Sequence, residues 1–211
     1  MMRGLQSHRR LANILRRFGF DDCASQIVEF ALSLPLLVLF VVGIYDFSGA
    51  LSLKQKLTNA AREAARIAAA DPANDLSGPL LVMPVSVNDA YQVVDNYLIS
   101  EKLNDCGLSA SPPVHTGGLT WSFSASGNGC PAGGITLTVN RGFYFPQTAT
   151  GQATLGCAST SVANGQTAVV GTCVSIQYAY QWQFNAASGL FGQNFLAPST
   201  ITTTAVTFNQ N

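Results

Sequence analysis

The chain has 211 residues, enough for one or two ordinary domains with a sizeable core. Only 10% of its residues are charged and 47% are apolar, whereas soluble proteins average about 25% charged residues, so the composition disfavours an intracellular enzyme and favours a secreted or cell-surface protein. The formal net charge of +0 hides an asymmetry: five basic residues face two acidic ones in residues 1–24, and two basic residues face five acidic ones after Asp71.

The N-terminal head, residues 1–24, is rich in arginine. Its basic residues are Arg3, Arg9, Arg10, Arg16 and Arg17. Such a cluster is typical of a nucleic-acid-binding arm or of the cytoplasmic flank of a membrane helix. Because an apolar segment follows directly, the positive-inside rule accounts for the arginines. We therefore expect a cytoplasmic leader and no nucleic-acid partner.

The apolar segment runs from Ile27 to Tyr45, nineteen residues whose only charge is Glu29. A bilayer-spanning helix needs about 20 residues. Signal peptides have shorter apolar cores of about 7 to 15 residues and a small-residue cleavage site, which this run lacks. Pro35 lies inside the segment, where a membrane helix tolerates it as a kink. The segment is predicted to cross the membrane with the N-terminus in the cytoplasm.

The helical pattern continues beyond the apolar segment. Apolar residues recur mostly at steps of three and four, and Asp71-Pro72 supplies a stop signal. One helix is therefore predicted from about residue 25 to 70, within a segment 25–71. We expect its small-residue face to serve in helix packing: Ala60, Ala61, Ala64, Ala65 and Ala68.

Residues 72–211 are predicted to form an extracytoplasmic α+β domain. Helical spacing over 88–104, with Asn88 or Asp89 as N-cap and Gly107 as terminator, predicts a second helix. From residue 119 onward the period changes to two, which predicts an antiparallel sheet of about four strands against which that helix packs. The polar stretch 146–167 is predicted to be a long exposed loop.

Four cysteines, Cys106, Cys130, Cys157 and Cys173, lie in this outer domain. An even number in an oxidising compartment indicates two disulfides, for which three pairings are possible. The sequence does not decide among them. We favour Cys157 with Cys173, closing the loop before its strand, and Cys106 with Cys130. Their wide spacing and the lack of a Cys-x-x-Cys pair argue against a metal site.

Sequence signatures of catalysis are missing. The chain has no Gly-x-Ser-x-Gly elbow and no phosphate-binding loop. His115 follows two prolines in "SPPVHTGG", where a solvated loop histidine is the simpler interpretation. We expect no enzymatic activity and no cofactor.

Several blocks in the first helix occur in a characteristic order. These are "VEFA" at 28–31, "LPLL" at 34–37, "GIYDF" at 43–47 and "NAAREAAR" at 59–66. Together they resemble the N-terminal segment of TadE-like proteins, the pseudopilins of tight-adherence (Flp-type) pilus systems. "VSIQYAYQW" at 174–182 and "TTTAVTF" at 202–208 resemble the closing strands of that family less specifically.

The resemblance implies processing at one bond. In such families a prepilin peptidase cuts just before the apolar segment, and the glutamate is the fifth residue of the mature chain. Carried over, the cut falls between Ala24 and Ser25, and Glu29 can pair with the new amine of a neighbouring subunit. The family usually has Gly before the cut, where this chain has Ala24. An uncleaved anchor, with Glu29 as an interfacial charge near the helix dipole, therefore stays open.

The resemblance further implies a non-catalytic function. The chain would be a minor pilin or pseudopilin, or a membrane-anchored assembly component, of a tight-adherence pilus. It would cross the inner membrane once, with its C-terminal domain periplasmic or extracellular. Its partners would be membrane lipid, the assembly machinery, other pilin-like subunits and, for a cleaved form, prepilin peptidase. The alternative is an anchored exported binding module or a hydrolase with its site in the 146–167 loop.

Overall fold

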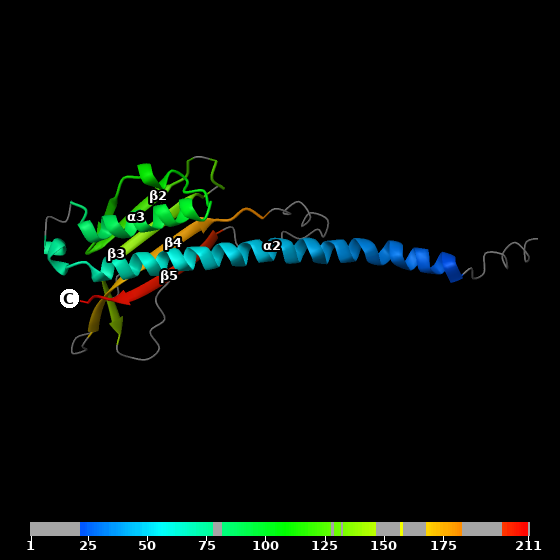
Figure 1. The fold of residues 1–211 in the computed structure, drawn as a ribbon, viewed down its shortest axis with the longest axis horizontal. Helices are drawn as coiled ribbons and strands as arrows, with labels where there is room; N and C mark the ends of the chain where they lie inside the picture. Colours follow the sequence, from blue (N-terminus) through cyan, green and yellow to red (C-terminus); the bar gives the residue numbers. More distant parts are fainter. Residues whose placement is uncertain are drawn as a thin grey trace, which may run out of the picture. The chain divides into compact units, whose positions relative to one another are not determined.

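The computed structural model describes residues 22–77, 82–127, 129–131, 133–146, 157, 168–182 and 200–210. By its internal contacts the chain divides into Met1–Asp46 and Phe47–Asn211. One helix, α2 (Asp22–Ala70), occupies the described part of the first unit and continues into the second (Figure 1). It includes Pro35 and ends directly before Asp71-Pro72, as the sequence predicts. The division by contacts therefore falls inside the helix, before the boundary at residue 72 expected from the sequence.

The second unit joins the end of α2 to a further helix and an antiparallel sheet. Its elements after α2 are the 3₁₀ turns η1 (Ala73–Ser77) and η2 (Leu108–Ala110), the helix α3 (Val85–Ser100), and the strands β1 (Val114–Gly117), β2 (Thr120–Ala125), β3 (Ile135–Pro146), β4 (Ala168–Ala179) and β5 (Thr200–Phe208). The sheet is a meander in the order β1-β2-β3-β4-β5. This confirms the α+β fold and adds β1 to the four predicted strands.

Helices α2 and α3 cover one face of the sheet (Figure 1). The register places Leu137 opposite Phe123 on one side and Ile176 on the other, so that one parity of every central strand meets the helices. The sheet contributes to the core the side chains of Trp121, Phe123, Ile135, Leu137, Val139, Val174, Ile176, Tyr178 and Ala205. The opposite parity carries mainly hydroxyl and amide side chains, including Ser122, Ser124, Thr136, Thr138, Gln177 and Thr202. The period-two alternation of the sequence thus separates a helix-covered face from a polar one.

The alanine face of α2 packs inside the domain. Its five alanines have no exposed surface: Ala60, Ala61, Ala64, Ala65 and Ala68. They share one core with Leu57 of the same helix, Val94 of α3 and Ile176 of β4. Short side chains allow the helix axis to lie close to its neighbours. The packing partner of this face is therefore the chain itself, and the face is not exposed for a second subunit.

Both ends of α3 differ from the sequence prediction. The helix starts at Val85, after Pro84, and not at Asn88 or Asp89. The Ser86 amide donates to Asp75 Oδ2 of η1 at 2.9 Å, so the capping carboxylate comes from eleven residues upstream. The helix ends at Ser100, and Lys102 takes a φ of 55°, well before Gly107. Sequence-local capping rules miss a cap supplied by another element.

The alanine packing leads to a stability prediction. We expect Ala64→Leu to lower the free energy of unfolding by about 1 to 3 kcal/mol, because extra methylenes overpack a filled interface. Ala70→Leu, at the exposed last residue of the same helix, is the control and should change it by less than about 0.5 kcal/mol. Denaturant unfolding of the detergent-solubilised chain, followed by tryptophan fluorescence, measures both. Equal losses would contradict the assignment of this face to the core.

Candidate functional site

The first half of α2 exposes most of its apolar side chains. Apart from the partly buried Leu39 and Val42, the large apolar side chains from Ile27 to Tyr45 are 45% to 72% exposed. Within the described residues, α2 is the one helix long and apolar enough to cross a membrane, with a mean hydropathy of 2.5 over a window of which 0% is buried. A long helix whose apolar side chains are mostly exposed in the described structure fits a lipid environment. This agrees with a single-pass membrane protein.

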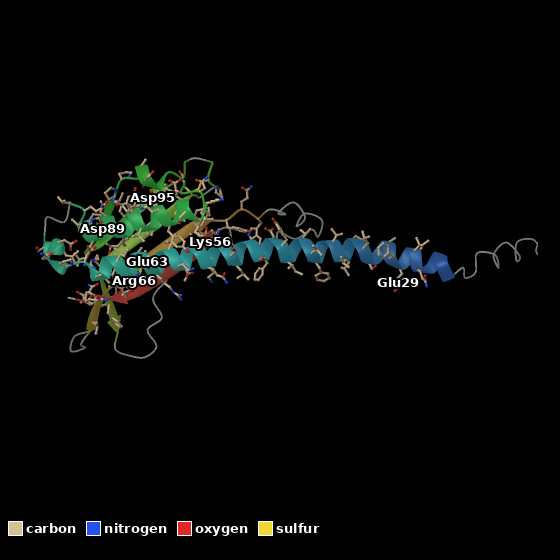
Figure 2. All side chains as sticks on the ribbon, viewed as in Figure 1. Glu29, Lys56, Glu63, Arg66, Asp89 and Asp95 are labelled. Carbon is tan, nitrogen blue, oxygen red and sulfur yellow. A yellow bond between two sulfur atoms is a disulfide. The ribbon has the colours of Figure 1, made fainter. Side chains whose placement is uncertain are left out.

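Glu29 lies seven residues, or about two turns, from the start of α2, and its side chain is exposed (Figure 2). Its neighbours Val28 and Phe30 are 60% and 64% exposed. No Lys, Arg or His occurs between Arg17 and Lys54, so the helix itself provides no nearby cation. Ala24 and Ser25 lie in the first turn of the same helix, upstream of the glutamate. The helix thus carries an isolated carboxylate within an apolar surface.

At the other end of α2 lies the largest fully buried side chain in the described structure, that of Arg141. Its Nη1 donates to the carbonyl oxygen of Ala68 and, at 3.0 Å, to Thr172 Oγ1. Its Nη2 donates to the carbonyl oxygen of Asp71 at 3.1 Å. Asn209 Oδ1 lies 3.5 Å from Nη1. One guanidinium therefore joins the end of α2 to β3, β4 and the residue after β5.

The electrostatics of this end explain why an arginine is buried there. The last carbonyls of a helix have no intrahelical donor and carry partial negative charge, and α2 has no basic residue in its last turn. Burial lowers the pKa of Arg141, while the nearby carboxylates of Asp75 and Asp71 raise it. An arginine stays protonated in proteins despite such a shift. Burial and the charge of Asp89 raise the pKa of Asp71, and Arg141 opposes that rise.

A β-bulge and a disulfide support the strand that carries Arg141. The β3–β4 register shifts between Asn140 and Phe143, which brackets the arginine. Asn140 is buried, accepts from the Gly142 amide at 2.9 Å and donates to the Cys157 carbonyl at 3.0 Å. Cys157 is bonded to Cys173 of β4, with a Cα–Cα distance of 5.6 Å. The bulge therefore lets Arg141 turn to the helix side while Phe143 packs with this disulfide.

The second disulfide joins Cys106 to Cys130 across 5.3 Å between Cα atoms. Both pairings are those favoured from the sequence. Cys106 is buried, and its carbonyl accepts from the Gly127 amide at 2.9 Å, so this bond fastens the segment after α3 to the end of β2. The 146–167 loop lies outside the described residues except for its first residue, in β3, and Cys157.

His115 lies in β1 and not in a solvated loop. Its Nε2 is 2.8 Å from the Gly118 carbonyl oxygen, and its ring centroid is 5.3 Å from that of Trp121. The imidazole is thus engaged in the β1–β2 hairpin. Among the described residues, no group of three or more His, Cys, Asp or Glu side chains is placed to hold a metal ion.

The sequence carries a signal for Arg141 that pattern reading did not use. From Cys106 to the last residue, Arg141 is the only Asp, Glu, Lys or Arg. It lies in the alternating run "TLTVNRGFYF", where a charge breaks a strand pattern. A lone charge in such a run indicates a specific buried partner. The sequence does not say that the partner is a helix end about 70 residues upstream.

A long apolar helix that continues as the core helix of an α+β domain is consistent with a single-pass membrane protein. Residues 24–66 match the family described as TadE-like protein. The match covers the apolar part of α2 and the alanine face except Ala68, and it confirms the resemblance inferred from the ordered sequence blocks. The first helix is therefore similar to TadE-like proteins over residues 24–66. Comparisons with curated proteins and with solved structures gave no match.

The helix-end contacts predict a large effect of one substitution. Arg141→Met leaves the Ala68 and Asp71 carbonyls without their buried donor, so we expect a loss of about 3 kcal/mol or more in the free energy of unfolding. Lys102→Met removes the other basic residue after Asp71, which is exposed, and should cost less than about 0.5 kcal/mol. Denaturation midpoints of the solubilised full chain compare the two. A loss for Arg141→Met no larger than the loss for Lys102→Met would refute the stabilising role of the Arg141 hydrogen bonds at the end of α2.

Proposed function

We propose that this chain is a TadE-like pilin-like subunit, or pseudopilin, of a tight-adherence pilus system, and that it acts by assembly without catalysis. The observation that carries the proposal is the division of α2 into two parts. Its second half packs inside the chain's own domain, whereas the segment Ile27–Tyr45 presents a mostly exposed apolar surface in which Glu29 is the only acid. The TadE-like match over residues 24–66 supports a pilus-associated role for this helix.

The orientation follows from charge. The arginine-rich head precedes the span, and the only bases after Lys56 and before Lys102 are Arg62 and Arg66 on the helix that enters the domain. The positive-inside rule puts the head in the cytoplasm. The folded domain and its two disulfides then lie in an oxidising compartment outside the inner membrane. The partners are membrane lipid, other pilin-like subunits and the assembly machinery.

Glu29 is proposed to bind a neighbouring subunit. An ionised acid within a membrane helix is costly and pairs where it can. No cation occurs from residue 18 to residue 53, which favours a pairing group from another chain or from a new amine. Cleavage between Ala24 and Ser25 by a prepilin peptidase would create that amine four residues from Glu29.

Substitution of Glu29 tests the assembly role. We expect Glu29→Gln and Glu29→Leu to stay in the membrane after carbonate extraction but to reduce pilus assembly about tenfold or more, since losing ~1.4 kcal/mol of contact energy corresponds to a factor of ten. Glu63→Gln is the control. Glu63 lies on the domain half of α2 and pairs with Arg66 at 2.7 Å, so its loss should leave assembly near the wild-type level (Figure 2). Unchanged pilus production in both Glu29 variants would contradict the assembly role and would leave α2 with membrane anchoring alone.

Processing has a separate prediction. Mass spectrometry of the membrane-bound protein should find Ser25 as the N-terminal residue. Ala24→Gly, which restores the family's usual residue, should be processed at least as completely, and Ala24→Leu should accumulate the uncut chain because a bulky residue hinders the peptidase. An intact leader in all three proteins would make the chain a permanent anchored component.

A further inference from the structure

The chain carries an aromatic pair just beyond the last residue of β4. The rings of Tyr180 and Trp182 meet edge to face, with centroids 5.1 Å apart. Both side chains are partly exposed, and Gln181 between them is exposed. Tyr180 is partly buried and packs against the hydrophobic core. The pair therefore lies at the margin of the core, where part of each side chain reaches the surface.

The position of this pair along α2 is fixed by a close approach. A Cβ atom added to Gly49 would lie 3.0 Å from the Tyr180 hydroxyl oxygen. Glycine therefore lets the residue after β4 approach the helix backbone at this point. Two further side chains on this stretch of helix, Phe47 and Leu51, are 58% and 45% exposed. The aromatic pair thus lies beside the first turns of α2 that belong to the folded domain.

Those turns come directly after the predicted span. Gly49 is four residues beyond Tyr45, a rise of about 6 Å along the helix. The polar layer on each side of a bilayer's hydrocarbon core is about 5 to 7 Å thick. Lys54, the first cation beyond the span, is about 13 Å from Tyr45 on the same scale. The level of Gly49 is therefore that of the lipid headgroups.

We propose that Tyr180 and Trp182, together with Phe47 and Leu51, form an interfacial anchor that seats the domain on the headgroup layer of the bilayer. Tyr and Trp prefer this layer because their rings are apolar at one end and hydrogen-bond at the other. The strands β1 to β5 carry no acidic residue; the acids nearest the anchor are Asp105, whose charge acts on Tyr178, and the buried Asp46 directly before Phe47. The anchor requires that α2 spans the membrane, but it is independent of pilus assembly.

The anchor is tested by tryptophan depth in the full chain, reconstituted in vesicles of phosphatidylcholine and phosphatidylglycerol. The chain has two tryptophans, and Trp121 is 2% exposed in the core, so it serves as the internal reference. Lipids that carry a spin label on the headgroup or in the middle of the acyl chain quench tryptophan fluorescence by contact. We expect the headgroup label to quench Trp182 at least threefold more than the mid-chain label does. In Trp182→Phe, the remaining Trp121 emission should be insensitive to both labels.

In Trp121→Phe, Trp182 is the only tryptophan, so its quenching is measured directly. If this core substitution impairs folding, the quenching of Trp182 is obtained instead as the difference between the wild type and Trp182→Phe. Quenching of Trp182 by aqueous iodide without quenching by headgroup label would overturn the anchor, because the ring would then face water. Shielding from both quenchers would also overturn it, because the ring would then be covered by the chain itself or by a second copy.

A third variant separates the anchor from the span. Phe40→Trp, at a 60% exposed position of the apolar half, is placed in the Trp121→Phe, Trp182→Phe background, so that the introduced indole is the only one in the chain. Quenching of this indole by the mid-chain label shows a membrane span. Failure of Trp182 alone then rejects only the anchor, whereas failure of both rejects the span on which it rests.

Discussion

The buried hydrogen bonds of Arg141 are the constraint on which the rest of the domain depends. A helix that leaves the membrane and enters a fold must end somewhere, and its last carbonyls need donors. Here the donor comes from β3, and the same guanidinium reaches Thr172 on β4 and Asn209 after β5. Because three strands and the helix end share one cation, the register of the sheet and the position of α2 on it are determined together.

The alanine face follows from that arrangement. A helix held at its end against a sheet packs well only if its side chains leave room for the strands, and α2 meets the core with five alanines of 0% exposure beside Leu57. From sequence the same residues fit an assembly surface equally well, since small residues also mediate packing between membrane helices. Their burial in the chain's own core assigns them to folding.

Periodic signals predicted what is local in this fold. The ends of α2, the alternation of β2 to β4 and the TadE-like blocks are all visible in short windows of sequence. What the sequence did not reveal depends on residues far apart in the chain. β1 has only four residues and little alternation, Asp75 caps α3 from another element, and Arg141 binds carbonyls about 70 residues upstream. The partners of Asp75 and Arg141 are recognisable only once the chain is folded.

Glu29 and Arg141 are isolated charges that require opposite solutions. Arg141 is the only charged residue from Cys106 to the last residue of the sequence. In the folded domain its guanidinium donates hydrogen bonds to oxygen atoms of Ala68, Asp71, Thr172 and Asn209. Glu29 lies on a helix whose sequence offers no cation from residue 18 to residue 53. A charge satisfied within its own chain stabilises the subunit and is unavailable to others. A charge that its own helix leaves unsatisfied, in a medium where charge is costly, favours association with a second chain. The same helix therefore carries at one end the interaction that ties it to the sheet, and at the other the group that we propose joins subunits.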